Sequence, residues 1–407
     1  MNVPALPSLR GFFRLLAGSS PVRESARRQT RLEALLGRDT EPAPISFEQS
    51  RALAGKSVLV TGAGGSIGSE VCRRLLYYGP AHLILVEMSE AALYEIDLEL
   101  RELQRGASGC EIIPLIGDVR NEDTRRRIFE NYDVHVVFHC AAYKHVPMME
   151  LNPNEAVLNN VQGTVEFASS ARDAGVDRFV LISTDKAVRP ISIMGATKRI
   201  AELYVQGLAL ATDTRFLTVR FGNVMGSSGS VIPLFQRQIE SGGPVTVTHP
   251  GVERYFMTVA EAANLVIQAG VMHDSGEMFV LDMGRPVRID ELAREMISAS
   301  GKRIGRDIRI EYIGLRPGEK LTEELTSQSE VLEQTPNARI RRIRSNAPAL
   351  PELRQAISEL VQVARSGNRA AIDACIRRIV PEYDPGHGRL HGRTHSQSLS
   401  PESSATG

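Results

Sequence analysis

A glycine-rich turn at residues 61–68 is the first feature of the sequence whose residue types and spacing could do chemistry. It reads Thr-Gly-Ala-Gly-Gly-Ser-Ile-Gly, and it lies between an apolar run at 57–60 and an apolar helical pattern. Glycines allow a tight turn and a close approach of the backbone, and a helix N-terminus offers free N–H groups and partial positive charge to a pyrophosphate. The turn therefore predicts a dinucleotide site. Its expected contacts are Gly62, Gly65, Ser66, Ile67 and Gly68.

Carboxylates and small residues that follow the next apolar runs extend this site. Glu87, at the end of the second run, can accept hydrogen bonds from both ribose hydroxyls, and residues 88–90 offer no cation for a 2′-phosphate, which favours NAD over NADP. Asp118, after the third run, either meets the adenine edge or caps the helix that follows it. Ala141 and Ala142, after the fourth run, are small enough to let a loop pass close to the cofactor.

A second reactive group follows the fifth apolar run. Thr184, Asp185 and Lys186 are consecutive, and Lys198 lies in a helical pattern that opens near Met194. An adjacent carboxyl group and amine can act as general acid and base, whereas the alternative is an exposed pair that caps the next segment. A lysine is a base only when it is neutral. We therefore expect burial and the like charge of Lys198 to lower the pKa of Lys186, and an apolar site to raise that of Asp185.

The elements that position these residues form an alternating pattern. Short, nearly continuous apolar or β-branched runs are typical of strands that are buried on both faces of a parallel sheet, and helical patterns lie between them. This alternation predicts an α/β fold, a doubly wound (Rossmann) parallel sheet with a smaller C-terminal substrate-binding part. The expected strands are 57–60, 83–86, 112–116, 134–139 and 179–182, and the expected helices are 67–78, 91–104, 121–131 and 154–174.

The chain has 407 residues, enough for roughly one large domain or two to three ordinary ones. After Gly222 the alternation becomes irregular, so we place the substrate-binding part there. His387, His391 and His395 near the C-terminus have the spacing of one helix face, but the glycines between them argue against a helix and against a metal site. The predicted divisions are an N-terminal extension at 1–50, an NAD-binding domain at 51–222, the substrate-binding part at 223–345, a helical segment at 346–383 and a disordered tail at 384–407.

Composition excludes several classes of protein. The 48 basic residues balance 48 acidic ones, so no net charge draws the chain to nucleic acid. No apolar stretch reaches the roughly 18 to 20 residues that a membrane helix needs. The four cysteines are widely separated, which predicts neither a disulfide framework nor a zinc cluster and fits the cytoplasm. Apolar residues within 9–16 predict either a docking helix or a peripheral membrane contact.

The layout after the fifth run resembles that of the extended short-chain dehydrogenase/reductases. In that superfamily a Ser or Thr at the strand end and a Tyr-x-x-x-Lys sequence remove a hydroxyl proton while a hydride goes to the nicotinamide. Thr184 and Lys198 match these positions, but Met194 stands where the tyrosine is expected. Since a thioether cannot move a proton, this departure taken alone favours a catalytically silent NAD-binding regulator.

A wider set of motifs resembles the nucleotide-sugar 4,6-dehydratases of bacterial polysaccharide biosynthesis. Within this family, a branch with methionine at this position comprises UDP-N-acetylglucosamine 4,6-dehydratases. The resemblance implies this reaction with NAD as the cofactor. It also implies that Asp185 is the acid and that Lys186 is the base. Because Met194 replaces the tyrosine, Thr184 is the remaining candidate to relay the proton of the 4-hydroxyl, through water or Asp185. The motifs occur in order at 36–39, 142–147, 183–187, 220–224, 243–248, 254–258 and 316–321.

The same resemblance implies a clamp for a UDP-sugar, in which a planar guanidinium can bind two diphosphate oxygens. A 5-inverting dehydratase and a 4-epimerase of a UDP-N-acetylhexosamine are alternative activities. The superfamily also pairs helices such as 154–174 and 194–211 in a four-helix interface, which predicts a homodimer. The expected clamp residues are Asn223, Arg254, Arg316 and Glu319, while Lys144 and His145 are either substrate contacts or structural.

Overall fold

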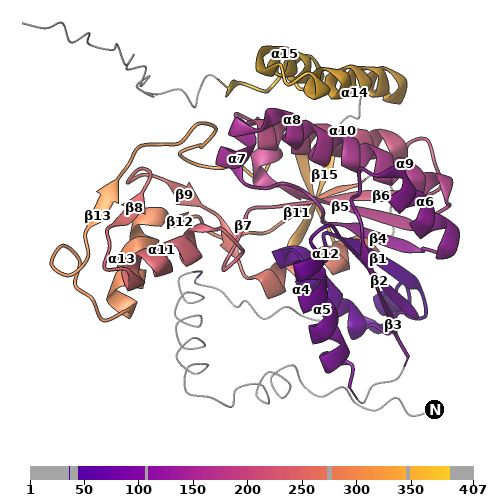
Figure 1. Ribbon diagram of the computed structural model, residues 1–407, viewed down its shortest axis with the longest axis horizontal. Coiled ribbons are helices and arrows are strands. Elements are labelled where there is room, and N and C mark those ends of the chain that lie inside the picture. The colour runs from indigo at the N-terminus through magenta and orange to yellow at the C-terminus, as the bar shows by residue number, and fades with distance from the viewer. Residues whose placement is uncertain (1–35, 37–44, 106–108, 273–276, 345–348, 386–407) are drawn as a thin grey trace, which may run out of the picture.

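The computed structural model describes residue 36 and residues 45–105, 109–272, 277–344 and 349–385. Within these residues a nine-stranded sheet, in the order β14-β15-β11-β6-β5-β4-β1-β2-β3, runs through the centre of the molecule (Figure 1). The strands from β11 to β3 are parallel to one another. At one edge β15 pairs antiparallel with β11, and β14 pairs antiparallel with β15. The predicted α/β fold with a doubly wound parallel sheet is thus confirmed.

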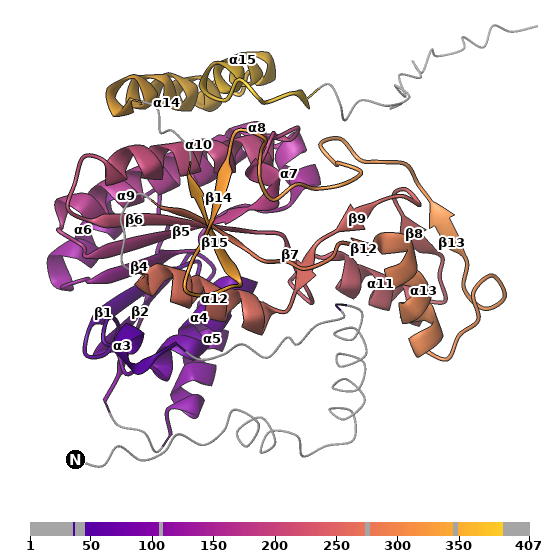
Figure 2. The same ribbon diagram turned by 180° about the vertical axis from the view of Figure 1, so that it is seen from behind.

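The central strands are buried on both faces, which is why their sequences are nearly continuous apolar runs. Figure 2 shows the antiparallel edge from behind, where β14 and β15 extend the sheet. The strand bounds are β1 (Ser57–Thr61), β2 (His82–Glu87), β3 (Glu111–Ile116), β4 (Val136–His139), β5 (Arg178–Thr184), β6 (Arg215–Phe221), β11 (Met278–Leu281), β14 (Val331–Gln334) and β15 (Ile340–Arg344).

Helices cover both faces of the sheet, and each face has its own apolar core. One face carries α3 (Phe47–Ser50), α4 (Ser66–Leu76), α5 (Glu90–Leu103) and α12 (Val259–Val271). The other face carries α6 (Glu122–Asn131), α7 (Val146–Leu151), α8 (Pro153–Ala156), α9 (Gly163–Asp173) and α10 (Ile193–Ala209). These layers place the N-termini of α4 and α10 at the carboxyl ends of the strands, where doubly wound folds bind their ligands.

The predicted helix at 154–174 is interrupted by a π-helical turn, η1 (Val157–Gln162), between α8 and α9. Asn160 in this turn is fully buried, and its side chain binds both backbone groups of Tyr143, accepting from N at 2.8 Å and donating to O at 2.9 Å. The same amide donates to Thr197 Oγ1 in α10 at 3.2 Å. The irregular turn thereby fixes the loop that follows β4 against α10, and such turns are frequent near functional sites.

A smaller lobe follows β6 and has a separate core that includes Phe235, Val245, Phe256 and Leu292. The predicted boundary at residues 222 and 223 does not coincide with the edge of the sheet, because β11, β14 and β15 come from the segment assigned to the substrate-binding part. The elements of the lobe are β7 (Asn223–Val224), β8 (Val245–Val247), β9 (Glu253–Arg254), β10 (Phe256–Met257), β12 (Val287–Arg288), β13 (Ile310–Tyr312), α11 (Val231–Glu240) and α13 (Ile289–Ala299).

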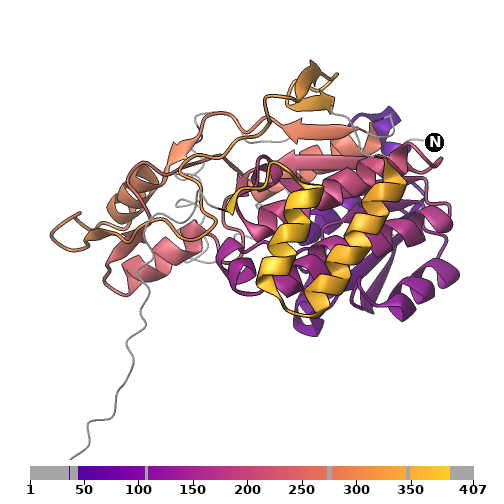
Figure 3. The same cartoon turned by 90° about the horizontal axis from the view of Figure 1, so that it is seen from above.

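The predicted helical segment at 346–383 contains α14 (Leu350–Arg365) and α15 (Arg369–Ile379), which lie as an outer layer across α8 and α10 (Figure 3). Their buried faces include Leu353 and Leu360 on α14 and Ile376 on α15. The face of α10 that was expected to pair with a second subunit is therefore covered by the chain's own helices. The apolar surface of α10 is therefore no argument for a subunit interface. The homodimer itself stays a prediction.

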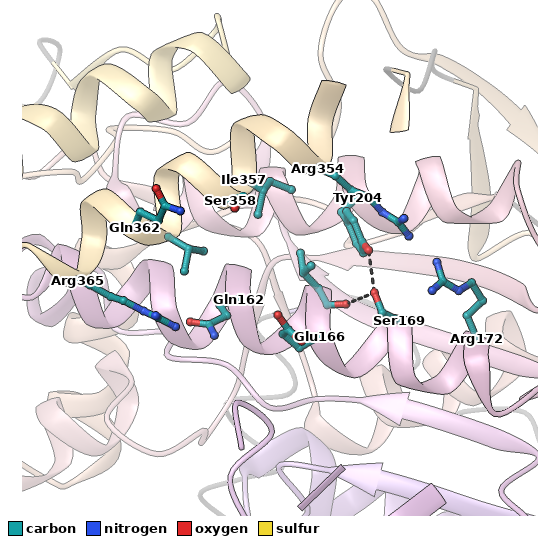
Figure 4. Close-up of a pocket in the computed structure, with 12 residues that line it drawn as sticks. Gln162, Glu166, Ser169, Arg172, Tyr204, Arg354, Ile357, Ser358, Gln362 and Arg365 are labelled. Carbon is teal, nitrogen blue, oxygen red and sulfur yellow. Dashed lines mark hydrogen bonds between the residues drawn. The ribbon is translucent and has the colours of Figure 1, made fainter. Parts of the chain in front are cut away.

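A groove of about 450 Å³ lies between α9, α10 and α14 (Figure 4). In it Ser169 and Tyr204 share a hydrogen bond of 2.8 Å, and the Arg354 guanidinium lies 5.9 Å from the centre of the Tyr204 ring. The carboxylate of Glu166, which lines the groove, is paired with Arg125 at 3.1 Å. None of the predicted cofactor, catalytic or substrate residues lines this groove, so the candidate active site lies elsewhere.

Several predictions concern residues that the structure does not describe. They are the apolar pattern at 9–16, most of the extension at 1–50 and the histidines at 387, 391 and 395. No helix in the described ranges is long and apolar enough to cross a membrane. In the same ranges, no three His, Cys, Asp or Glu side chains are grouped so that they could hold a metal ion.

Candidate active site

A cavity of about 310 Å³ lies at the carboxyl ends of β1 to β4. The glycine turn forms one wall, and the residues that follow β2, β3 and β4 form the others. Six of the residues predicted for the dinucleotide site line this cavity, namely Gly62, Gly65, Glu87, Asp118, Ala141 and Ala142.

The glycine turn can exist only with glycines at these positions. A Cβ on Gly62, which has φ of +64°, would lie 2.8 Å from Ala141 N, and a Cβ on Gly68 would lie 2.0 Å from Gly62 O. Gly65 is the N-cap of α4 and provides no side-chain cap, so the N–H groups of Ser66 and Ile67 in the first turn are left for an anion. This cradle fits the pyrophosphate of a dinucleotide.

Glu87 is fixed so that its carboxylate faces the glycine turn. One oxygen accepts from Gly64 N at 3.1 Å, and the other accepts from Met88 N at 2.9 Å and Ser89 N at 3.0 Å. The first of these oxygens, Oε2, accepts one bond and keeps a lone pair, whereas both lone pairs of Oε1 are used. The position therefore suits the contact to ribose hydroxyls that the sequence predicted.

Asp118 binds Arg120, with Arg120 Nε at 2.8 Å and 3.0 Å from its two carboxylate oxygens. Burial alone would raise the pKa of Asp118, but the hydrogen bonds and charge of Arg120 lower it. Asn121 caps α6 by accepting from Thr124 N at 3.1 Å, so the alternative in which Asp118 caps this helix is wrong. Contact with an adenine edge stays a prediction for Asp118.

Gly68→Ala tests the cradle. We expect the variant to bind NAD at least about tenfold more weakly, because the new methyl group would collide with the carbonyl of Gly62 and displace the turn from α4. Isothermal titration with NAD measures the change. Ser69→Ala is the matched control in the same helical turn and should bind NAD like the unmodified protein. Equal affinity of Gly68→Ala and the control would contradict the predicted role of this turn.

The predicted acid and base lie together after β5, in the short 3₁₀ helix η2 (Asp185–Ala187). Asp185 is fully buried, and its Oδ1 accepts from Thr184 Oγ1 at 2.9 Å and from Lys186 Nζ at 2.9 Å. Lys186 Nζ also donates to Asn223 Oδ1 at 3.1 Å and lies 3.4 Å from Glu323 Oε1. The alternative of an exposed Asp-Lys pair is therefore wrong.

The protonation of Lys186 differs from the expectation. Burial alone would lower its pKa, but the neighbouring carboxylates of Asp185 and Glu323 outweigh burial and raise it. The prediction of a lowered pKa for Lys186 is thus wrong. It is Lys198 whose pKa falls, to about 8, because burial dominates there.

Helix α10 brings Met194 and Lys198 to the same end of the sheet. Ser192 caps the helix by accepting from Gly195 N at 3.1 Å, and a Cβ on Gly195 would lie only 2.1 Å from Lys186 O, so the helix begins directly against the acid and base segment. Met194 is buried among apolar residues. Lys198 is buried as well, and within the described part of the chain its ammonium has no hydrogen-bond or ion-pair partner. Its three donors therefore remain for a bound ligand.

The predicted clamp residues lie next to this group, but most of Arg254 is already engaged. Its guanidinium donates to the carbonyls of Glu253, Lys320 and Leu321 at 2.7 to 3.1 Å and to Glu319 Oε1 at 3.2 Å. Arg254 thus holds the segment that follows Arg316, whose own side chain is exposed. Binding of a diphosphate by these residues stays a prediction.

Lys144 and His145 follow β4 on the same side of the sheet. The His145 ring lies against the backbone of Gly229, since a Cβ there would be 2.5 Å from His145 Cε1. Both Lys144 and His145 are exposed. The choice between substrate contact and a structural role stays a prediction for both residues.

Sequence reasoning missed Glu323 and a buried charge network. Arg220 is fully buried and binds Glu202 of α10 at 2.8 Å and Glu330 at 2.9 Å, and Ser183 Oγ donates to Glu202 Oε1 at 2.6 Å. The motif at 220–224 contains Arg220, and Glu323 lies two residues beyond the motif at 316–321. Their positions in or beside the motifs were the one indication that the sequence offered. Their partners could not be predicted, because these come from distant parts of the chain.

The sequence is similar to those of several known proteins. The capsular polysaccharide biosynthesis protein CapD of Staphylococcus aureus is 51% identical over 308 residues, which are 75% of this chain and 50% of CapD. The chain therefore spans about half the length of that relative. A UDP-glucose 4-epimerase of Rickettsia rickettsii is 35% identical over 280 residues, which are 68% of this chain and 79% of the epimerase.

Among solved structures, Pen from Bacillus thuringiensis is 34% identical and superposes with a TM-score of 0.65, over 75% of this chain and 99% of Pen. Residues 58–345 match the family model described as polysaccharide biosynthesis protein. This range contains the glycine turn, the acid and base segment, the clamp residues and every motif named above except the one at 36–39. The chain belongs to this family of polysaccharide biosynthesis proteins.

Proposed function

We propose that this chain catalyses the NAD-dependent 4,6-dehydration of UDP-N-acetylglucosamine to the UDP-4-keto-6-deoxy sugar, for the synthesis of surface polysaccharide or glycan. The observation that carries the proposal is the hydrogen-bonded group of Thr184, Asp185 and Lys186 beside the dinucleotide cradle. The relationship to CapD supports a role in polysaccharide synthesis. The relationship to a UDP-glucose 4-epimerase supports a nucleotide-sugar substrate.

The reaction needs both an acid and a base. Bound NAD supplies a hydride acceptor for sugar carbon 4 and a hydride donor for carbon 6. The resulting 4-ketone acidifies the proton on carbon 5, which Lys186 removes as a neutral amine. Asp185, as a carboxylic acid, gives a proton to the 6-hydroxyl, which leaves as water.

Lys186 has to change its protonation before it can act as a base. The neighbouring carboxylates raise its pKa, which favours the ammonium. Lys186 therefore releases one proton to the solvent before dehydration and becomes an amine. The proton of the 4-hydroxyl then passes to Asp185 and makes this residue the acid that the departing 6-hydroxyl needs.

Thr184 is the group that we assign to the proton of the 4-hydroxyl. Its Oγ1 donates to Asp185 Oδ1 at 2.9 Å. A proton that arrives at Thr184 can therefore pass directly to Asp185. Lys198, with its pKa of about 8, fits a role in holding hydroxyls of the cofactor and lowering the pKa of nearby groups by its positive charge.

Proton NMR of the purified protein with UDP-N-acetylglucosamine in deuterated water tests the proposal. We expect a 4-keto-6-deoxy product with one deuterium at carbon 5 and the configuration there retained. The NAD should be regenerated in each turnover, so no external reductant is needed. Stoichiometric release of NADH, or activity only with NADP after removal of the natural cofactor, would contradict this reaction.

The same spectra separate the alternatives. A 4-epimerase moves a hydride without removing water, so it would keep the 6-hydroxyl and take up no deuterium at carbon 5. A 5-inverting dehydratase would give the opposite configuration at that carbon. A catalytically silent regulator would bind NAD and leave the sugar unchanged, although such a protein has no use for an acid and base pair.

A further inference from the structure

We propose that Glu323 is a positioning residue of the candidate active site, whose buried carboxylate acts with Asp185 to hold the Lys186 side chain and to set when it can act as a base. This inference rests on the proposed function for its catalytic meaning. The charge relationship itself can be measured without turnover.

The geometry places Glu323 in direct reach of the reactive amine. Its Oε1 lies 3.4 Å from Lys186 Nζ and 4.0 Å from Arg254 Nε, and its side chain is 4% exposed. An ammonium has three donors, and the three acceptors nearest to Lys186 Nζ are Asp185, Asn223 and Glu323. Glu323 thus completes the set of acceptors around this amine.

Structural contacts do not occupy both carboxylate oxygens of Glu323. Its second oxygen, Oε2, is buried and has no hydrogen-bond partner among the described residues. Burying a carboxylate whose oxygens are not all paired costs free energy of folding. Its presence here therefore indicates that the charge of Glu323 has a use. The nearest charges that can compensate it are Lys186 and Arg254.

Contacts on both sides of Glu323 fix its position. Before it, Arg254 binds the carbonyls of Lys320 and Leu321, and Lys320 Nζ donates to Val188 O at 2.8 Å. After it, Glu324 pairs with Arg189. Two residues on, Arg220 Nη1 donates to Leu325 O at 3.1 Å. The segment is therefore tied to β6, β9 and the loop after η2, and Glu323 cannot leave Lys186 without breaking several of these contacts.

The charged groups around Lys186 come from three parts of the chain. Asp185 is its neighbour in η2, Arg254 faces it from β9, and Glu323 and Lys320 face this site from the segment after Arg316. The two carboxylates favour the ammonium form, and Arg254 opposes it. Without the charge of Glu323, Asp185 is the one carboxylate beside the amine in the described part of the chain, so the neutral base should form at lower pH.

The test is competitive labelling of lysines with acetic anhydride between pH 6 and 11, in the full chain with its bound cofactor and without sugar nucleotide. Mass spectrometry of the peptide that carries Lys186 gives the pKa of this amine from its rate of acetylation. Glu323→Gln removes the charge and keeps the volume. Since a unit charge lies 3.4 Å away, we expect the Lys186 pKa to fall by about one unit or more, a tenfold change in proton affinity.

Glu324→Gln is the matched control, because Glu324 is adjacent in the chain but pairs with Arg189 instead of Lys186. Its Lys186 pKa should equal that of the unmodified protein. Glu323→Asp keeps the charge but moves it away from the amine, because the aspartate side chain is shorter by one carbon. This variant should therefore lower the Lys186 pKa less than Glu323→Gln does. This second variant decides the question if Glu323→Gln does not fold.

Dehydration measured across the same pH range gives the second readout. The rise of kcat/KM with pH should move to lower pH in Glu323→Gln and stay in place in Glu324→Gln. Unchanged acetylation pKa values in both Glu323 variants would overturn the inference. A shifted pKa in proteins that dehydrate no sugar nucleotide would uphold the role of Glu323 and overturn the proposed function instead.

Discussion

Lys186→Ala should lower the rate of dehydration by about two to four orders of magnitude, the usual contribution of a positioned acid or base. NAD binding should persist, since Lys186 does not line the cavity of the glycine turn. Turnover is measured by NMR and NAD affinity by titration. Because the change leaves Asp185 and Glu323 without their ammonium partner, Lys186→Met serves as a second variant that fills more of the space, and thermal unfolding checks that both variants fold.

Met194→Leu provides the contrast. Met194 is buried among apolar residues and has no proton to give, so a leucine of similar volume should cost far less activity than the loss of Lys186. If Lys186→Ala turns over at nearly the normal rate, or if a folded Met194→Leu is equally inactive, the division of labour proposed for this site is wrong.

Arg220→Met should have the largest effect on stability. The side chains of Arg220 and Glu202 are fully buried. Removing the arginine leaves Glu202 with Arg199 as its ion-pair partner and leaves Glu330 without an ion pair among the described residues. Breaking a buried pair in this way typically costs about 3 to 5 kcal/mol. Urea unfolding should show this loss as a lower midpoint, whereas Arg101→Met, which breaks an exposed pair with Asp97, should cost less than about 1 kcal/mol.

The pH dependence of the free energy of unfolding tests the same buried charge network. Burial would raise the pKa of Glu202, but Arg220, with help from Arg199 and Ser183, lowers it to about 2. A carboxylate with a lowered pKa contributes its stabilisation fully above its ordinary value near 4.5, and this contribution is lost as the pH falls toward 2. Arg220→Met should weaken this acid dependence. A triple variant that also carries Glu202→Gln and Glu330→Gln should recover part of the stability.

The sequence by itself determined the features that depend on neighbours along the chain. Gly62 and Gly68 must be glycine because the backbone there approaches Ala141 and the turn itself too closely for a Cβ, and this requirement is visible in the glycine spacing of the sequence. The parallel strands are visible because burial on both faces demands continuous apolar runs. The adjacency of Thr184, Asp185 and Lys186 likewise needs no tertiary structure to be seen.

Tertiary structure alone decided the state of those groups. The expectation that the Lys186 pKa is lowered failed, because it counted burial and Lys198 but could not include Glu323, which reaches the amine from a distant segment. The covering of α10 by α14 and α15 was equally hidden, since a buried helix face looks the same in sequence whichever helices cover it. Composition and spacing show which side chains are present, but Coulombic energies and burial depend on distances that only the folded chain sets.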